Sequence, residues 1–178
     1  MLRELGIPFQ ACNPGIPETL NRKISPEEMA RELSVQKTKA CRRQGKLTVG
    51  MDTLVVVGKN ILGKPKDSAD AEEMLKTLSN RRHRVITGIA LLYGNRLVKD
   101  AETTWVRFRN IEAEEIRWYI DSKEPFDKAG AYAIQGLGRI FIQEIHGCYY
   151  NVVGFPLGCF QRLLGRLGFA LKDLIPDI

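Results

Sequence analysis

The chain has 178 residues, of which 44% are hydrophobic, so it is long enough to bury a core and to fold as a single domain. Its 27 Lys and Arg residues outnumber its 21 Asp and Glu residues, an excess that suits an anionic ligand but is too small to indicate binding of duplex nucleic acid. No apolar run reaches the roughly 18 residues of a membrane helix and no signal peptide is recognisable, which excludes a membrane partner and favours the cytoplasm.

The first predicted element is a helix over about residues 26–43. Ser25 is a suitable N-cap, Pro26 suits the first helical position, and Glu28 completes a capping box. Lys37 lies on the predicted inward face, where its stem can pack while its ammonium reaches water, so a structural role is as plausible as a functional one. The other residues of that face are Met29, Leu33, Ala40 and Cys41.

Residues 46–58, KLTVGMDTLVVVG, predict one or two buried strands with a carboxylate, Asp52, inside the apolar run. A buried carboxylate without a partner costs several kcal/mol or more, so such a residue is usually paired, bound to metal or used in catalysis. The following GKP turn leads into a helix that ends near Ser79. The spacing predicts that this helix buries Ala71, Met74, Leu75 and Leu78.

Two strand-like runs between residues 83 and 108 flank Gly94-Asn95, which predicts a hairpin with Thr104, Val106 and Phe108 on one face. The later elements are a helix, a glycine-rich segment over residues 124–138, a short strand over residues 139–145 and a final helix. The inward residues expected in these two helices are Ala113, Ile116, Ile120, Phe160, Leu163, Leu164 and Leu167. Strands mixed with helices predict an α/β sheet protein.

The four cysteines, Cys12, Cys41, Cys148 and Cys159, are scattered and form no CxxC pair. Their spacing therefore predicts neither a zinc site nor a disulfide framework, which suits a reducing compartment.

Five polar residues stand out as candidates for chemistry: Asp52, Lys64, Lys37, Lys128 and Gln135. Each has an ordinary explanation, because a carboxylate can cap a turn, lysines can be solvated in loops and a glutamine can bond a loop backbone. Together they describe a carboxylate that holds a divalent metal or activates a water, beside ammonium groups that neutralise phosphate oxygens.

The surrounding glycines and the missing motifs narrow this interpretation. Gly130, Gly136 and Gly138 would let the backbone approach a ligand closely. The sequence contains no Walker A motif, no GxGxxG at a strand-helix junction and no HExxH. The sequence therefore predicts a protein that cleaves a phosphoanhydride but lacks the commonest nucleotide-binding motifs.

Four segments in order, GMDTLVVVGKNILGKPKD, NRRHRVITGIAL, EPFDKAGAYAIQG and GCYYNVVGFP, make the chain resemble the Maf family, also called septum formation inhibitor proteins. The resemblance implies a mixed sheet flanked by helices, with two lobes and a nucleotide cleft between them. It also implies a nucleoside triphosphate pyrophosphatase that uses magnesium or manganese, forms a homodimer and binds no nucleic acid. The implied biological role is removal of unwanted nucleotides from the cellular pool, or restraint of cell division.

The resemblance also implies roles for individual residues. Asp52 matches the catalytic aspartate and a metal ligand, and Glu18 matches an acidic metal-binding position, although Pro17 replaces the acid before it. Lys37 and Lys64 match lysines near the phosphates. Thr53 and Gln135 match the positions that select dTTP and UTP.

Family members begin with a strand and a phosphate-binding turn of the type LASxSPRR, whereas this chain begins with MLRELGIPF. The resemblance therefore predicts a single domain over residues 1–178 that lacks this strand and turn, either by a late start codon or by natural truncation. In the second case we expect an impaired nucleotide-binding or division-regulating protein. A nucleic-acid binder that uses Trp105 or Trp118 is the third alternative.

Overall fold

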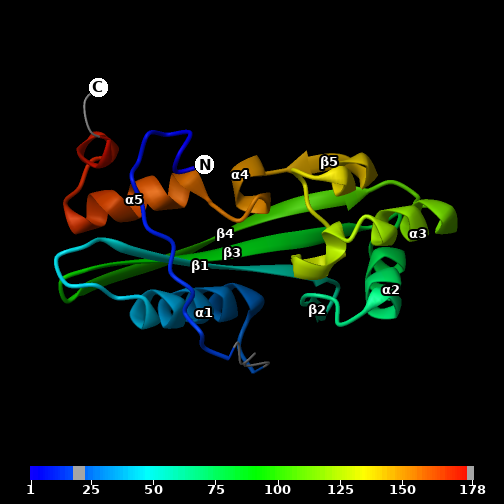
Figure 1. Cartoon of the computed structure of the whole chain (residues 1–178), viewed down its shortest axis with the longest axis horizontal. Helices are drawn as coiled ribbons and strands as arrows, with labels where there is room; N and C mark the ends of the chain where they lie inside the picture. The colour runs from blue at the N-terminus through cyan, green and yellow to red at the C-terminus, as the bar shows by residue number, and fades with distance from the viewer. Residues whose placement is uncertain (18–22, 176–178) are drawn as a thin grey trace. The chain divides into compact units, whose positions relative to one another are not determined.

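The computed structural model describes residues 1–17 and 23–175, and within these ranges the chain forms a five-stranded antiparallel sheet flanked by helices (Figure 1). The strand order is β2-β1-β3-β4-β5, which confirms the predicted α/β class. The strands are β1 Thr48–Val57, β2 Asn60–Leu62, β3 Arg82–Tyr93, β4 Arg96–Phe108 and β5 Ile142–His146. The α-helices are α1 Pro26–Ala40, α2 Ser68–Leu78, α3 Ala113–Asp121, α4 Tyr149–Val152 and α5 Leu157–Leu167.

The chain divides into two compact units, and β1, β3 and β4 contribute residues to both. The first unit comprises Met1–Asp52, Thr87–Glu102 and Phe155–Ile178, and the second comprises Thr53–Ile86 and Thr103–Gly154. Among the described residues, no helix combines the length and the hydropathy needed to cross a lipid bilayer.

In the first unit, α1 and α5 cover opposite faces of the strands. The apolar face of α5 packs on Ile89 and Leu91, whose side chains share one face of β3. Helix α1 lies on the other face, because Gly88 and Gly50 offer no side chain to keep it away: a Cβ at Gly88 would be 2.0 Å from the Ala30 carbonyl oxygen. The residues that α5 buries are those predicted from spacing, Phe160, Leu163, Leu164 and Leu167.

Helix α1 begins with the predicted cap, the Ser25 hydroxyl accepting the Glu28 N–H at 3.2 Å, while the Glu28 carboxylate, predicted to complete a capping box, accepts from Arg31 and Lys99. The helix ends at Ala40 rather than residue 43. Its buried face is also different from the expectation at its C-terminal end, because Thr38 is buried whereas Ala40 is exposed. Burial of Thr38 is possible because its hydroxyl bonds the carbonyls of Ser34 and Ala90 at 2.7 and 3.2 Å. The hydrogen bond to Ala90 fixes α1 on β3.

A disulfide joins Cys12 to Cys41, so the expectation of no disulfide was wrong. The two Cα atoms lie 6.0 Å apart, although 29 positions separate the residues in sequence. The same two segments are also joined by a 2.6 Å hydrogen bond from the Arg43 guanidinium to the Gln10 side chain. Sequence spacing does not reveal this proximity, because it depends on residues 10–12 lying beside the C-terminal end of α1 in the folded chain.

Reduction of this disulfide is expected to lower the free energy of unfolding by about 3–4 kcal/mol, because it frees a closed loop of 29 residues in the unfolded chain. Urea unfolding with and without reductant measures the difference. A Cys12→Ser variant is the control, since its unfolding midpoint should not respond to reductant. Equal midpoints for the oxidised and reduced parent protein would contradict the prediction.

The core of the second unit is formed by the inner faces of α2 and α3 and by the buried residues of β1, β3 and β4. The predicted alternation along β4 is confirmed, since Thr104, Val106 and Phe108 are buried. Ile116 and Ile120 of α3 are buried as predicted, but Ala113 is exposed because it is the first residue of the helix.

The predicted strand over residues 139–145 is only partly confirmed. Residues 137–141 form the 3₁₀ helix η3 (Leu137–Phe141), and the strand β5 begins at Ile142. The Glu124 carboxylate accepts the N–H groups of Leu137 and Gly138 at 2.8 and 3.1 Å, which satisfies the first donors of a helical turn. This contact from a distant side chain explains why an apolar run typical of a strand starts as a helix.

Candidate functional site

The carboxylate of Asp52 is paired with the ammonium of Lys37, and both residues belong to the first unit. Asp52 is only 8% exposed, and the Lys37 side chain is 20% exposed. Of the three possibilities for a buried carboxylate in this apolar run, paired, bound to metal or used in catalysis, the structure shows the first. The inward placement of Lys37 on its helix has the same explanation, since the lysine reaches the strand beneath it.

The sequence around Gly50 brings these two residues together. Side chains alternate along β1, so Gly50 and Asp52 face α1 while Val49 and Met51 face the core beside α5. A Cβ at Gly50 would be 2.3 Å from the Thr38 hydroxyl oxygen and 2.6 Å from the Thr38 nitrogen. Only glycine permits this approach, and Lys37, the residue before Thr38, thereby comes within reach of Asp52.

In the second unit, two predicted phosphate-binding lysines lie near one carboxylate, Asp127. The Lys128 ammonium donates to Asp127 at 2.6 Å, and this bond is the main reason why the pKa of Asp127 is lowered. The positive charge of Lys64 lowers the same pKa further. The Gly130 N–H also donates to the Gly63 carbonyl at 2.9 Å, so the turn that carries Lys64 is bonded to the segment that carries Lys128.

Gln135 and Thr53, the predicted base-selecting residues, also belong to the second unit. Gln135 is exposed and lies between the 3₁₀ helices η2 (Ala129–Ala131) and η3. Thr53 is half-buried, and Gly154 lies against it, since a Cβ there would be 3.3 Å from the Thr53 hydroxyl oxygen.

The three glycines expected to approach a ligand each have a close neighbour inside the protein. A Cβ at Gly130 would be 2.8 Å from the Val55 side chain, and one at Gly136 would be 2.1 Å from the Glu124 carboxylate. A Cβ at Gly138 would be 2.7 Å from the Tyr119 hydroxyl. Packing within the second unit therefore suffices to require glycine at each position.

The predicted metal ligands can be compared with the structure only in part, because Glu18 lies outside the described residues. Within residues 1–17 and 23–175, no three His, Cys, Asp or Glu side chains gather in a way that could hold a metal ion. Among the predicted metal ligands in the described residues, Asp52 would therefore supply one carboxylate to a bound cation. This donor set fits magnesium, which is commonly held by one or two carboxylates together with substrate phosphates and water.

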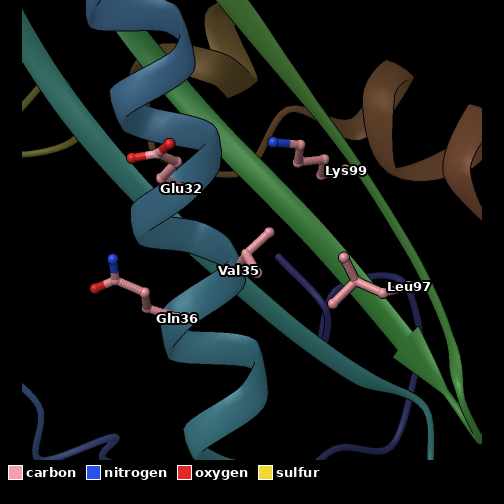
Figure 2. A pocket seen from close by; sticks show the side chains of 5 residues that line it. All are labelled: Glu32, Val35, Gln36, Leu97 and Lys99. Carbon is pink, nitrogen blue, oxygen red and sulfur yellow. The ribbon is translucent and has the colours of Figure 1, made fainter. Parts of the chain in front are cut away.

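A small pocket of about 270 Å³ lies in the first unit, and none of the predicted site residues lines it. The lining residues are Glu32, Val35, Gln36, Leu97 and Lys99, and Figure 2 shows Val35 of α1 pointing towards Leu97, whereas Glu32 and Gln36 extend from the opposite side of the helix in this view. The Lys99 ammonium is already bonded to Glu28 at 2.6 Å. The pocket contains no predicted functional residue and is smaller than typical cofactor sites, so we assign it no role.

Sequence reasoning missed three residues that shape the second unit around the predicted site: Asp127, Glu124 and Tyr119. Glu124 and Asp127 stand inside the motif EPFDKAG, where their charge was a visible signal. Tyr119 gave no signal, because its spacing on α3 is that of an ordinary core residue. Tyr132, two residues after this motif, is also structural, since its hydroxyl is bonded to the buried His83 ring at 2.8 Å.

Comparison with known proteins gives a consistent result along the chain. Residues 1–167 match the family described as Maf-like protein. A dTTP/UTP pyrophosphatase of Symbiobacterium thermophilum is 43% identical over 173 residues, which cover 96% of this chain and 89% of the relative. Proteins of the same name from Halalkalibacterium halodurans and Ruminiclostridium cellulolyticum are 41% and 44% identical, covering 97% and 94% of this chain and 92% and 89% of those relatives.

Proposed function

The chain belongs to the Maf family, and we propose that it is a nucleoside triphosphate pyrophosphatase that converts dTTP and UTP to the monophosphate and pyrophosphate. The observation that carries the proposal is the buried Asp52 carboxylate held beside Lys37, in a chain whose relatives carry the name of this activity. A positioned carboxylate can act as a general base that accepts a proton from an attacking water.

In this proposal Asp52 orients a water and accepts one of its protons as the oxygen adds to phosphorus. The bond between the α and β phosphates breaks, and pyrophosphate leaves with the bonding electrons. Lys37 holds Asp52 in place, because the ammonium donates to the carboxylate on the strand. Lys64 and Lys128 offset negative charge on the phosphates, which stabilises a transition state with more charge on the leaving group.

A divalent cation, magnesium or manganese, completes the proposal. Asp52 would hold it together with the phosphates, and Glu18 is the proposed second carboxylate. When bound, the cation supplies Lewis acid polarisation of the phosphoryl oxygens.

Thr53 and Gln135 are proposed to recognise the pyrimidine. A hydroxyl and an amide can bond the oxygen and nitrogen atoms on the edge of uracil or thymine. Thr53 follows Asp52 directly in the chain, so one peptide bond links the proposed catalytic and base-contacting residues. We also propose that the protein is a cytoplasmic homodimer. We propose no nucleic-acid partner for it.

A substrate panel tests the proposed function. The purified chain with magnesium should release pyrophosphate and the monophosphate from dTTP and UTP, with a higher kcat/KM than for CTP, ATP or GTP. Chromatography of the products distinguishes this reaction from release of inorganic phosphate. Binding of dTTP without turnover would instead favour an impaired nucleotide-binding protein, and equal turnover of all five nucleotides would contradict pyrimidine selection.

A further inference from the structure

The carboxylate of Glu124 holds one end of the loop that carries Gln135. Its two oxygens accept hydrogen bonds from the backbone N–H groups of Leu137 at 2.8 Å and Gly138 at 3.1 Å. The same carboxylate accepts the hydroxyl of Tyr119 at 2.8 Å. Glu124 thus bonds the backbone two and three residues after Gln135.

Tyr119 holds the other end of the same loop. Its hydroxyl accepts the N–H of Ala133 at 3.2 Å while it donates to Glu124, and its ring is fully buried against Phe141. The backbone is therefore fixed on both sides of Gln135, at Ala133 before it and at Leu137 and Gly138 after it. All of these residues belong to the second unit.

The protonation of both groups supports these bonds at neutral pH. Partial burial alone would raise the pKa of Glu124, but hydrogen bonds from Leu137, Gly138 and Tyr119 outweigh it, and the pKa is lowered. Burial raises the pKa of Tyr119, and its bond to Glu124 raises it further. The carboxylate consequently remains an acceptor and the phenol remains a donor.

We propose that Glu124 and Tyr119, which together we call the clamp, are positioning residues that set the preference for dTTP and UTP by holding the Gln135 loop in one conformation. The Gln135 side chain is exposed, so its own packing does little to orient it. Its direction depends on the backbone, which these two side chains fix. A carboxamide discriminates between bases only when its oxygen and nitrogen are presented at defined positions.

The inference rests on the proposed function, because it concerns the same base-selecting residue. It assigns a role in base selection to Glu124 and Tyr119, which need not touch the substrate. It also accounts for Gly136 and Gly138, since a side chain at either would collide with Glu124 or Tyr119.

The test compares the ratio of kcat/KM for UTP to that for CTP in the parent and in Glu124→Gln, Tyr119→Phe and Gln135→Ala. Glutamine keeps the size of Glu124 but replaces one acceptor oxygen by a donor, which faces an N–H or O–H group of the clamp. We expect the ratio to fall about tenfold in Gln135→Ala and by a similar factor in each clamp variant. The double variant Glu124→Gln/Gln135→Ala should show no further fall, because both changes act through one side chain.

Glu115→Gln is the matched control. Glu115 lies on the same helix as Tyr119 and pairs with Arg109 at 2.6 Å, but no bond joins it to residues 133–138 in the described contacts. We expect Glu115→Gln to lower the melting temperature and to leave the ratio unchanged, since partial unfolding lowers kcat/KM equally for both nucleotides.

Two outcomes would overturn the inference. If Gln135→Ala loses discrimination while Glu124→Gln or Tyr119→Phe folds and keeps it, the clamp does not set specificity. If Gln135→Ala keeps the parent ratio, Gln135 does not read the base and the clamp has nothing to position. Failure of the proposed function is distinguishable from both, because the parent protein would then hydrolyse neither UTP nor dTTP. Tyr119→Phe removes one oxygen atom only, so it provides the test if Glu124→Gln does not fold.

Discussion

Replacing Asp52 by Asn is expected to lower the rate of dTTP hydrolysis by about a thousandfold or more, because an amide cannot accept the proton of the attacking water. The substitution keeps the size of the side chain, so the close approach of α1 and β1 at Gly50 is retained. Pyrophosphate release under single-turnover conditions measures the chemical step. Turnover near the parent rate would exclude Asp52 as the catalytic residue.

The same substitution removes the counter-charge of Lys37, so a loss of stability accompanies the loss of activity. We expect this loss to be about 1–2 kcal/mol, less than the roughly 3–5 kcal/mol of a fully buried pair, because the Lys37 side chain is 20% exposed and its ammonium can turn towards water. Thermal melts of the variant and the parent measure the difference.

A double variant separates the two roles. In Asp52→Asn/Lys37→Met no unpaired ammonium remains, so the melting temperature should recover while hydrolysis stays abolished. Glu28→Gln is the matched control, because Glu28 pairs with Lys99 in the same unit at 2.6 Å and has no predicted catalytic role. It should keep the parent rate. Recovery of activity together with stability in the double variant would show that Asp52 acts only as a structural partner.

Local patterns predicted the elements whose burial follows from spacing along the chain. The apolar positions of α2 and α5 and the alternation of β4 were correct because each of these elements buries one continuous face against a core. The same spacing also marked Asp52 and Lys37 as unusual, since each was a charged residue at an inward position. Their pairing with each other did not follow from sequence spacing, because it depends on how closely α1 approaches β1.

The features that the sequence did not reveal are contacts between distant segments. The disulfide joins Cys12 to Cys41, and the Glu124 carboxylate starts the turn at Leu137. The glycines of the QGLG segment illustrate the same limit: glycine indicates a close approach, but the approaching group is known only from the structure. For Gly136 that group is a side chain of the protein, Glu124.

Removal of divalent metal is expected to lower the rate of dTTP hydrolysis strongly. Of the three lysines that we propose for the phosphates, two are already paired, Lys37 with Asp52 and Lys128 with Asp127. Their positive charge is thus partly offset, and a triphosphate beside Asp52 would be repelled unless a cation is present. With excess EDTA we expect the rate to fall by at least about a hundredfold, the effect of losing several kcal/mol of transition-state stabilisation.

The melting temperature in EDTA provides the control for this prediction. Within residues 1–17 and 23–175 no cluster of three ligating side chains is present, so chelation should leave the thermal melt unchanged while it lowers turnover. Excess magnesium or manganese should then restore the rate, and the restored activity should again favour dTTP and UTP. Undiminished pyrophosphate release in excess EDTA would contradict a metal-dependent reaction, because the lysines alone would then be neutralising the phosphates.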